Sequence, residues 1–195
     1  MNFIFDLGNV LVDWNPDRFI AGYEISDREK QHIETELFGH ADWLAMDKGT
    51  KNLVDVIADV SARSGMSQET VEYCIEQMKL SLLTIERSAA LLQTLHKDGH
   101  GVYGLSNMSH DTYDYLKGRE FFNYFADIVI SAEIKMVKPD LEIFEYTLNR
   151  FGIKAEQSVF IDDMEYNIIA AQKLNINCVH FKRTPECYDE IVSYI

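Results

Sequence analysis

Short apolar runs alternate with segments of helical periodicity along most of this 195-residue chain. Each run is too short for a helix and ends in glycine or polar residues, which indicates buried strands near residues 2–5, 101–105, 128–130, 158–161 and 178–181. Apolar residues at helical spacing predict helices near residues 86–95, 111–117, 141–151 and 167–174. This alternation predicts an α/β fold with a doubly wound parallel sheet.

One long stretch departs from this alternation and carries helical signals only. Ser26 and Glu29 have the spacing of an N-terminal capping box, and apolar residues recur at helical spacing in the second half of the stretch. We therefore predict an all-helical insertion at residues 15–81, here called the helical segment. The α/β core is then expected to comprise residues 1–14 and 82–195.

Polar residues suited to chemistry follow several of the predicted strands. Asp6 comes directly after the first strand, Ser106 and Asn107 after the second, and Asp162 and Asp163 after the fourth. Ligands bind beyond the carboxyl ends of the strands in a doubly wound sheet, so these side chains should converge at one edge. The helical segment leaves the same edge, and we expect it to cover the site as a lid.

The carboxylates expected at this edge of the sheet require positive charge nearby. Asp6, Asp162 and Asp163 would crowd together, and two carboxylates about 4 Å apart repel by roughly 4 kcal/mol at an effective dielectric of about 20. A bound cation relieves this repulsion, and oxygen ligands without His or Cys favour Mg²⁺. Lys138, held extended by Pro139, could pair with a carboxylate and a phosphate oxygen. Taken alone, Lys138 could be a surface lysine at a turn, and Asp162 and Asp163 could cap the helix that follows them. Their occurrence together with Asp6 and Ser106 favours phosphoryl transfer.

Composition narrows the partners and the compartment. The net charge of −14 argues against nucleic acid and anionic membranes, because binding to either needs a basic surface. A phosphate ester meets the same repulsion, so the site must offset it locally. Cys74, Cys178 and Cys187 form no Cys-x-x-Cys pair and indicate free thiols in a reducing compartment, the cytoplasm. No feature of the sequence indicates an oligomeric state.

Four short motifs occur in a fixed order: FDLGNV at residues 5–10, LSN at 105–107, KPD at 138–140 and DD at 162–163. As a set they resemble the motifs of the haloacid dehalogenase (HAD)-like hydrolase superfamily, over nearly the whole chain. The residues of the first and third motifs are most similar to those of the branch near glucose-1-phosphate phosphatases and the phosphatase domain of epoxide hydrolases. The resemblance implies a Rossmann-like core and identifies the helical segment with the helical cap of the family.

The resemblance also implies an activity and a role for each motif residue. The chain is expected to be a Mg²⁺-dependent phosphatase that acts on a small phosphorylated metabolite such as a sugar phosphate. Asp6 would attack phosphorus and form an aspartyl-phosphate that water then hydrolyses. Asp162 would hold a metal-bound water or Lys138. The phosphate group would be held by Ser106, Asn107 and Lys138, and the metal site would comprise Asp6, the Gly8 carbonyl, Asp162 and Asp163.

Gly8 is the departure from the family pattern, because phosphatases of this family usually carry a second aspartate there as acid and base. Either the leaving group departs readily, or a residue of the helical segment or a water molecule supplies the proton. Asn167, four residues past Asp163, either braces the acidic loop or lies on a helix surface. Residues of the helical segment expected to contact the substrate flank one turn: His40, Trp43, Met46, Asp47 and Lys48.

Two other functions stay open. A metal-independent haloacid dehalogenase also lacks the second aspartate, although such enzymes do not use the Asp162–Asp163 pair. Alternatively, Gly8 marks a catalytically weak protein that binds a phosphorylated ligand. Metal-independent release of halide would favour the first alternative, and an inert wild type that Gly8→Asp activates would favour the second.

Overall fold

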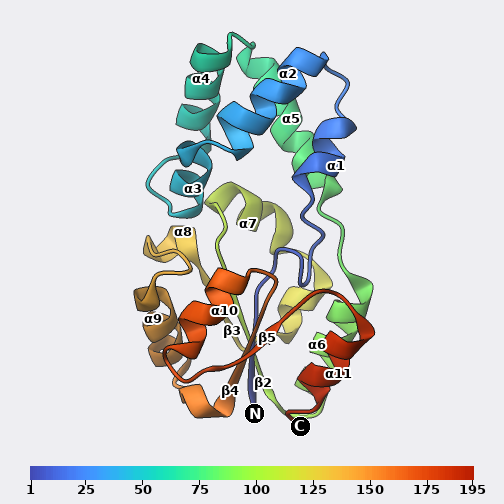
Figure 1. Ribbon diagram of the computed structural model, residues 1–195, viewed down its shortest axis with the longest axis vertical. Helices are drawn as coiled ribbons and strands as arrows, with labels where there is room; N and C mark the ends of the chain where they lie inside the picture. The colour runs from blue at the N-terminus through green and yellow to red at the C-terminus, as the bar shows by residue number, and fades with distance from the viewer.

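Five parallel strands form one sheet in the order β3-β2-β1-β4-β5 in the computed structural model, which describes residues 1–195 (Figure 1). Each strand lies within one residue of its predicted bounds, and the predicted doubly wound α/β fold is confirmed. Because β1 and β4 are neighbours, the residues that follow them emerge side by side. The strands are β1 (Asn2–Phe5), β2 (Gly101–Ser106), β3 (Asp127–Ile130), β4 (Ser158–Asp162) and β5 (Asn177–His180).

Both faces of the sheet are buried, as expected for parallel strands covered by helices. Along β1, Phe3 and Phe5 join one cluster of core residues and Ile4 joins the other, which follows the period of two of a strand. The apolar runs of the sequence therefore form the centre of a three-layered core. Helices α6 (Glu86–Lys97) and α11 (Pro185–Val192) cover the first face, and α9 (Leu141–Phe151) and α10 (Glu165–Gln172) cover the second (Figure 1).

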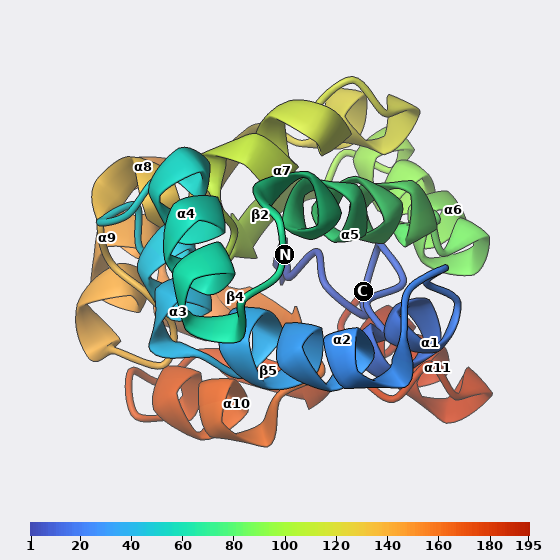
Figure 2. The same cartoon turned by 90° about the horizontal axis from the view of Figure 1, so that it is seen from above.

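The helical segment lies beyond the carboxyl ends of the strands, at one end of the elongated molecule (Figure 1). Seen from above, its helices spread over that end of the sheet (Figure 2). No helix in the protein has the length and apolar character of a membrane span. The helices of the segment are α1 (Pro16–Ala21), α2 (Asp27–His32), the π-helix η1 (Ile33–Phe38), α3 (Ala41–Asp47), α4 (Leu53–Ser64) and α5 (Gln68–Ser81).

The sequence did not predict α3 or η1. His40 caps α3 by accepting a hydrogen bond from the Asp42 N–H at 3.2 Å, and histidine is not among the usual N-cap residues. The residues before it, Phe38 and Gly39, indicated a chain break instead. The remaining helical elements are α7 (His110–Leu116), α8 (Ser131–Ile134) and the 3₁₀ turns η2 (Glu120–Tyr124) and η3 (Ala155–Gln157).

An aromatic cluster joins Trp14, in the chain between β1 and α1, to the helical segment. The ring centroids of Trp14 and Trp43 lie 5.6 Å apart in a stacked arrangement, and Phe38 meets Trp43 edge-on at 4.8 Å. Phe19 packs against both Trp14 and Phe38. Aromatic pairs of this kind add stabilisation beyond the area they bury, so they fix α3 relative to the chain that leaves the sheet.

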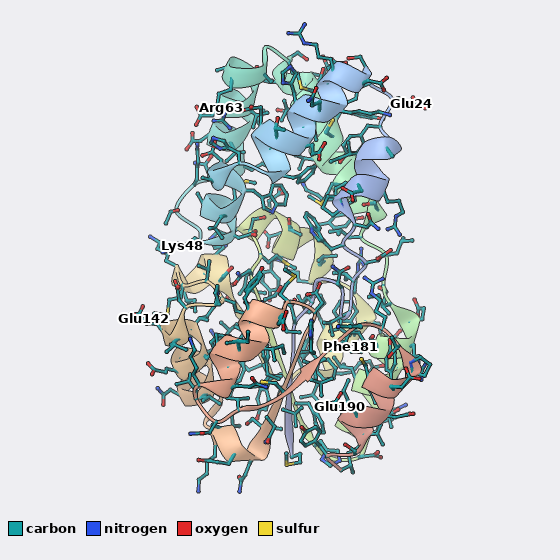
Figure 3. The ribbon with its side chains drawn as sticks, in the orientation of Figure 1. Glu24, Lys48, Arg63, Glu142, Phe181 and Glu190 are labelled. Carbon is teal, nitrogen blue, oxygen red and sulfur yellow. The ribbon has the colours of Figure 1, made fainter.

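The turn after α3 docks directly on α8. The Ser131 hydroxyl donates to the Asp47 carbonyl oxygen and accepts from the Met108 N–H at 2.9 Å. Gly49 packs so closely on α8 that a Cβ atom there would lie 2.2 Å from the Ala132 carbonyl oxygen. This turn, which includes Lys48 at the junction of the two parts (Figure 3), therefore has one defined position over the core.

An ion pair of a buried lysine makes a second junction. Lys79 on α5 is 6% exposed, and its Nζ lies 2.6 Å from Asp111 on α7. Burial lowers the pKa of Lys79, but Asp111 and Glu76 outweigh that effect and raise it. Polar contacts thus hold the helical segment to the core at two places, α3 against α8 and α5 against α7.

We expect Gly49→Ala to weaken the junction with α8. The added methyl group would collide with the Ala132 backbone, at a position whose φ is +69°. Gly65 has a φ of +74° with no atom near its missing Cβ, so Gly65→Ala is the control for backbone strain alone. Gly49→Ala should lower the free energy of unfolding in urea by about 1–3 kcal/mol more than Gly65→Ala. Equal losses would show that the junction yields freely to an extra methyl group.

Candidate active site

Asp6, Ser106 and Asp162 stand at the carboxyl ends of β1, β2 and β4, so the predicted convergence occurs. All three are buried, with exposed fractions of 7%, 2% and 0%. The Asp6 N–H donates to the Ile161 carbonyl at 2.9 Å, which continues the hydrogen bonding between β1 and β4 by one residue. The sheet itself therefore positions Asp6 beside Asp162.

Lys138 is the only cation among these carboxylates, and it is fully engaged. Its Nζ lies 2.9 Å from Asp6 Oδ1, 2.7 Å from Asp162 Oδ2 and 3.1 Å from the Leu105 carbonyl oxygen. Each ammonium proton thus has an acceptor. Burial lowers the pKa of Lys138, but Asp162 and Asp6 outweigh burial and raise it above its ordinary range. The lysine stays charged and orients the Asp6 carboxylate.

Asp162 receives donors on both oxygens. Besides Lys138, the Met164 N–H donates to Oδ1 at 2.8 Å, and Asn167 Nδ2 lies 3.0 Å from each oxygen. Asn167 therefore braces the acidic loop, the first of the two roles considered for it. Since Asp162 is completely buried and already bonded, its contacts suit the anchoring of Lys138 better than direct contact with a metal ion.

Asp6, Asp162 and Asp163 form the acidic cluster that the sequence predicted. One oxygen from each lies within 4.8 Å of the others. Burial raises the pKa of Asp6 to about 7; Lys138 opposes the rise, and the neighbouring carboxylates Asp162 and Asp163 add to it. Burial also raises the pKa of Asp163. Lys138 balances one of these three charges, so the cluster favours a further cation.

The donor set fits a hard divalent cation. Asp6 and Asp163 offer carboxylate oxygens at the pocket, and Gly8 lines the same surface. Buried Asn167 Oδ1 has no hydrogen-bond partner in the protein, although it belongs to the pocket wall. An ion with its water shell would give this acceptor a donor. The site thus fits Mg²⁺ on its ligand chemistry and on one unsatisfied buried oxygen.

Asn9 belongs to the site, although the sequence analysis did not select it. Its Nδ2 donates to Asp163 Oδ2 at 2.9 Å, and its carbonyl oxygen accepts from Arg183 Nε at 3.0 Å. Asn9 has a φ of +54°, a conformation that asparagine tolerates better than most residues. The signal in the sequence is an asparagine directly after Gly8 in the turn that leaves the first strand.

Ser106 and Asn107 play different parts. The Ser106 side chain lines the pocket beside Asp6 and is available to a bound anion. Asn107 makes a reciprocal pair with the Lys138 backbone: its Nδ2 donates to the carbonyl at 2.9 Å, and its Oδ1 accepts from the N–H at 2.8 Å. The Asn107 amide therefore fixes the Lys138 loop, which leaves its backbone as the part that can meet a phosphate.

A pocket of about 330 Å³ opens above the acidic cluster, between the core and the helical segment. Of the predicted substrate contacts, Trp43 and Asp47 line it, together with Leu44. The other three predicted residues lie elsewhere. Their positions are as follows: His40 caps α3, Met46 is buried in the core cluster, and Lys48 begins the turn against α8.

Asp47 is the polar group that α3 brings to the pocket. Although the residue is partly exposed, its carboxyl is enclosed by protein, and this burial raises the pKa of Asp47 to about 7. The backbone amide of Ser109 opposes the rise, and the charge of Asp6 adds to it. Two carboxyl groups with perturbed pKa values, Asp6 and Asp47, therefore share one pocket.

Sequence comparison identifies the family to which this arrangement belongs. Residues 3–181 match the family model of haloacid dehalogenase-like hydrolases. The chain belongs to that family. Among relatives of this HAD-like hydrolase, a sesquiterpene phosphatase of Aspergillus oryzae is 28% identical over 178 residues, covering 91% of this chain and 87% of the relative.

Solved structures agree with the family. A HAD family enzyme of Bacteroides thetaiotaomicron, in complex with magnesium and inorganic phosphate, superposes with a TM-score of 0.77 at 27% identity, over 93% of each chain. An L-2-haloacid dehalogenase of Xanthobacter autotrophicus superposes with a TM-score of 0.67 at 15% identity, over 98% of this chain and 82% of the other. The second likeness shows the shared fold alone.

We expect Lys138→Met to destabilise this HAD-like hydrolase strongly. The change leaves Asp6 and Asp162 buried without their cation, which costs about 3–5 kcal/mol of unfolding free energy at pH 8. Without Lys138, which opposes the rise, the pKa of Asp6 lies further above its unfolded value, so stability is lost as the pH rises toward the folded-state pKa. Urea denaturation in EDTA should therefore show a larger loss at pH 8 than at pH 5.

Lys117→Met is the matched control for this variant. Lys117 forms an ion pair with Asp114 at 2.6 Å, but both side chains are more than half exposed. Such an exposed pair contributes little to stability, because water and salt screen it. If the two variants lost equal stability with equal pH dependence, Lys138 would not be the counter-ion that the buried cluster requires.

Proposed function

We propose that the protein is a Mg²⁺-dependent phosphatase that hydrolyses a small phosphate monoester through an aspartyl-phosphate on Asp6. The observation that supports this most is the contact of Lys138 with both Asp6 and Asp162 beside Asp163, below a pocket of substrate size. A lone nucleophilic carboxylate needs no such acidic surroundings, whereas phosphoryl transfer with a divalent cation does.

The relatives support the same reaction class. The sesquiterpene phosphatase of Aspergillus oryzae matches nearly the whole chain, and the Bacteroides thetaiotaomicron enzyme holds magnesium and phosphate. The shared fold is compatible with the dehalogenase alternative. The contacts within this site do not favour it. A carbon–halogen hydrolase would gain nothing from Asp163 and Asn9 next to its nucleophile.

The helical segment is proposed to be a cap domain, with the boundaries expected from the sequence. Residues 15–81 would form the cap, and residues 1–14 and 82–195 the core. The pocket supports this division, because its floor comes from the sheet edge and its opposite wall includes Trp43, Leu44 and Asp47. A substrate held there contacts both parts at once, which links closure of the cap to occupancy of the site.

The site residues would divide the work as follows. Mg²⁺, held by Asp6, the Gly8 carbonyl and Asp163, would offset the charge of the transferred phosphoryl group. Asp162 would keep Lys138 in place, and Lys138 would hold the Asp6 carboxylate in line with phosphorus. The Ser106 hydroxyl and the Asn107 backbone would contact the phosphate oxygens. Asp6 would then attack, and water would release phosphate from it.

The pocket wall favours an alcohol with an apolar body over a sugar. Its lining includes Trp14, Trp43 and Leu44, together with Met164, the N-cap residue of α10, and Tyr166 in its first turn. Several of these apolar side chains keep large exposed areas, 53% for Leu44 and 51% for Tyr166. A sugar ring needs several hydrogen-bonding partners, and of the three pocket residues that the helical segment supplies, Trp43, Leu44 and Asp47, only Asp47 has a polar side chain that accepts or donates at a carboxyl group. The sugar phosphate expected from the sequence is therefore the second candidate.

Turnover of p-nitrophenyl phosphate with and without EDTA tests the reaction class. We expect hydrolysis that requires Mg²⁺ and is abolished by Asp6→Asn, since the amide cannot attack phosphorus. Thermal unfolding of the variant should show an intact fold, because the change removes a buried charge without removing volume. Retained turnover in Asp6→Asn would exclude Asp6 as the nucleophile, and halide release in EDTA would favour the dehalogenase.

A substrate panel tests the organic group. We expect kcat/KM to be higher for hexyl phosphate than for glucose 1-phosphate, and Trp43→Ala to reduce the value for hexyl phosphate by about tenfold or more, as loss of about 1.5–3 kcal/mol of apolar contact implies. Trp43→Phe, the matched control, should retain most of the activity. The inhibition constant of inorganic phosphate should stay unchanged in both variants. A preference for the sugar ester would contradict the apolar assignment.

A further inference from the structure

The missing aspartate at Gly8 is not forced by lack of space. A Cβ atom at Gly8 would meet only Asp6 Oδ2, at an ordinary contact distance of 3.9 Å. The Gly8 backbone lies outside the left-handed region, so a larger residue would cause no strain there. The site thus accommodates an acid at this position and lacks one, which leaves the proton for the leaving group to come from another residue.

The geometry of the reaction says where that residue should stand. In an in-line displacement, the attacking and leaving oxygens lie on opposite sides of phosphorus. Asp6 attacks from the sheet edge, so the leaving oxygen points away from the sheet, toward the helical segment. Of the pocket residues that come from this segment, Trp43 and Leu44 carry no exchangeable carboxyl proton, and Asp47 does.

The surroundings of Asp47 fix it in that wall. The Ser131 hydroxyl donates to its carbonyl oxygen, and the same hydroxyl accepts from Met108 in the loop after β2. Gly49, two residues on, leaves no gap between the turn and Ala132. Asp47 is therefore tied through α8 to the loop that carries Ser106, which is the precision that proton transfer demands.

The Asp47 carboxyl is also kept in a state that can give a proton near neutral pH. It is the last residue of α3, where the carbonyl end of the helix disfavours an anion. Its enclosure by protein and the nearby Asp6 act in the same direction, whereas no lysine or arginine contacts it to stabilise the carboxylate. By contrast, Asp42 on the same helix is paired with Lys51 and Arg63.

We propose that Asp47 is the general acid and base of this enzyme and replaces the aspartate that Gly8 lacks. The inference rests on the proposed phosphatase function and adds the residue that completes it. In the first step, Asp6 Oδ forms a bond to phosphorus as the bond to the leaving oxygen breaks, and the Asp47 proton moves to that oxygen to give the alcohol. In the second, the Asp47 carboxylate takes a proton from water as the water oxygen attacks phosphorus and the bond to Asp6 breaks.

The test compares leaving groups in wild type and Asp47→Asn. For hexyl phosphate, whose alkoxide needs a proton, kcat/KM should fall by about 10²–10⁴-fold, whereas for p-nitrophenyl phosphate it should change by about threefold or less. Because water activation is lost as well, the variant should release p-nitrophenolate in a burst followed by slow turnover, with phosphoenzyme accumulating. Calorimetric binding of Mg²⁺ and inorganic phosphate should be unchanged, which separates a chemical role from a folding defect.

Two further variants sharpen the result. Asp42→Asn removes a carboxylate from the same helix outside the pocket, so it should alter stability but not the ratio of the two kcat/KM values. Gly8→Asp combined with Asp47→Asn should recover hydrolysis of hexyl phosphate, because phosphatases of this family usually carry their acid at the position of Gly8. The acid of this double variant stands at position 8 and no longer at position 47, so recovery would show that the group lost in Asp47→Asn is an acid.

Each outcome decides a separate claim. Equal losses for both substrates, or no loss for either, overturn the role of Asp47 while the phosphatase function stands. A double variant that stays inactive toward hexyl phosphate, with intact binding of Mg²⁺ and phosphate, also counts against the role. A wild type that hydrolyses neither ester overturns the proposed function, and Asp47 then has no leaving group to protonate.

Discussion

The site depends on one constraint: three carboxylates at the end of a buried sheet share a single ammonium group. Lys138 contacts Asp6 and Asp162 at hydrogen-bonding distance, and its third proton meets the Leu105 carbonyl. Removing the lysine from such an arrangement leaves buried carboxylates without their cation. Other hydrogen bonds of the site hold this lysine and its carboxylates in position.

The residues that make these hydrogen bonds come from elements far apart in the sequence. The pairing of β1 with β4 sets Asp6 next to Asp162, and the Asn107 amide binds the backbone of Lys138 on both sides. From α10, the Asn167 side chain donates to the Asp162 carboxylate. Three loops and one helix are thus fixed to one another by hydrogen bonds around the fully buried Asp162 carboxylate, which holds the neighbouring Asp6 in one position.

Much of this could be predicted from the sequence, because the chemistry follows directly after strands. A short apolar run that ends in Asp6 or in Asp162 and Asp163 shows both the strand and the side chain it presents. The contacts of Asn9 with Asp163 and Arg183 could not be predicted, since turns have no periodicity that reveals which distant residues they meet. Helix α3 was missed for a related reason, as its cap is a histidine.

The Ser131 hydroxyl has a consequence for how such an enzyme can change. It joins the backbone of α3, which carries Trp43 and Asp47, to the loop after β2, which carries Ser106. The proposed contact with the organic group and the proposed proton donor therefore lie on one short helix. If these proposals hold, a mutation that shifts α3 to admit a new substrate also shifts Asp47, so substrate range and rate change together, whereas the carboxylates at the sheet edge keep their positions.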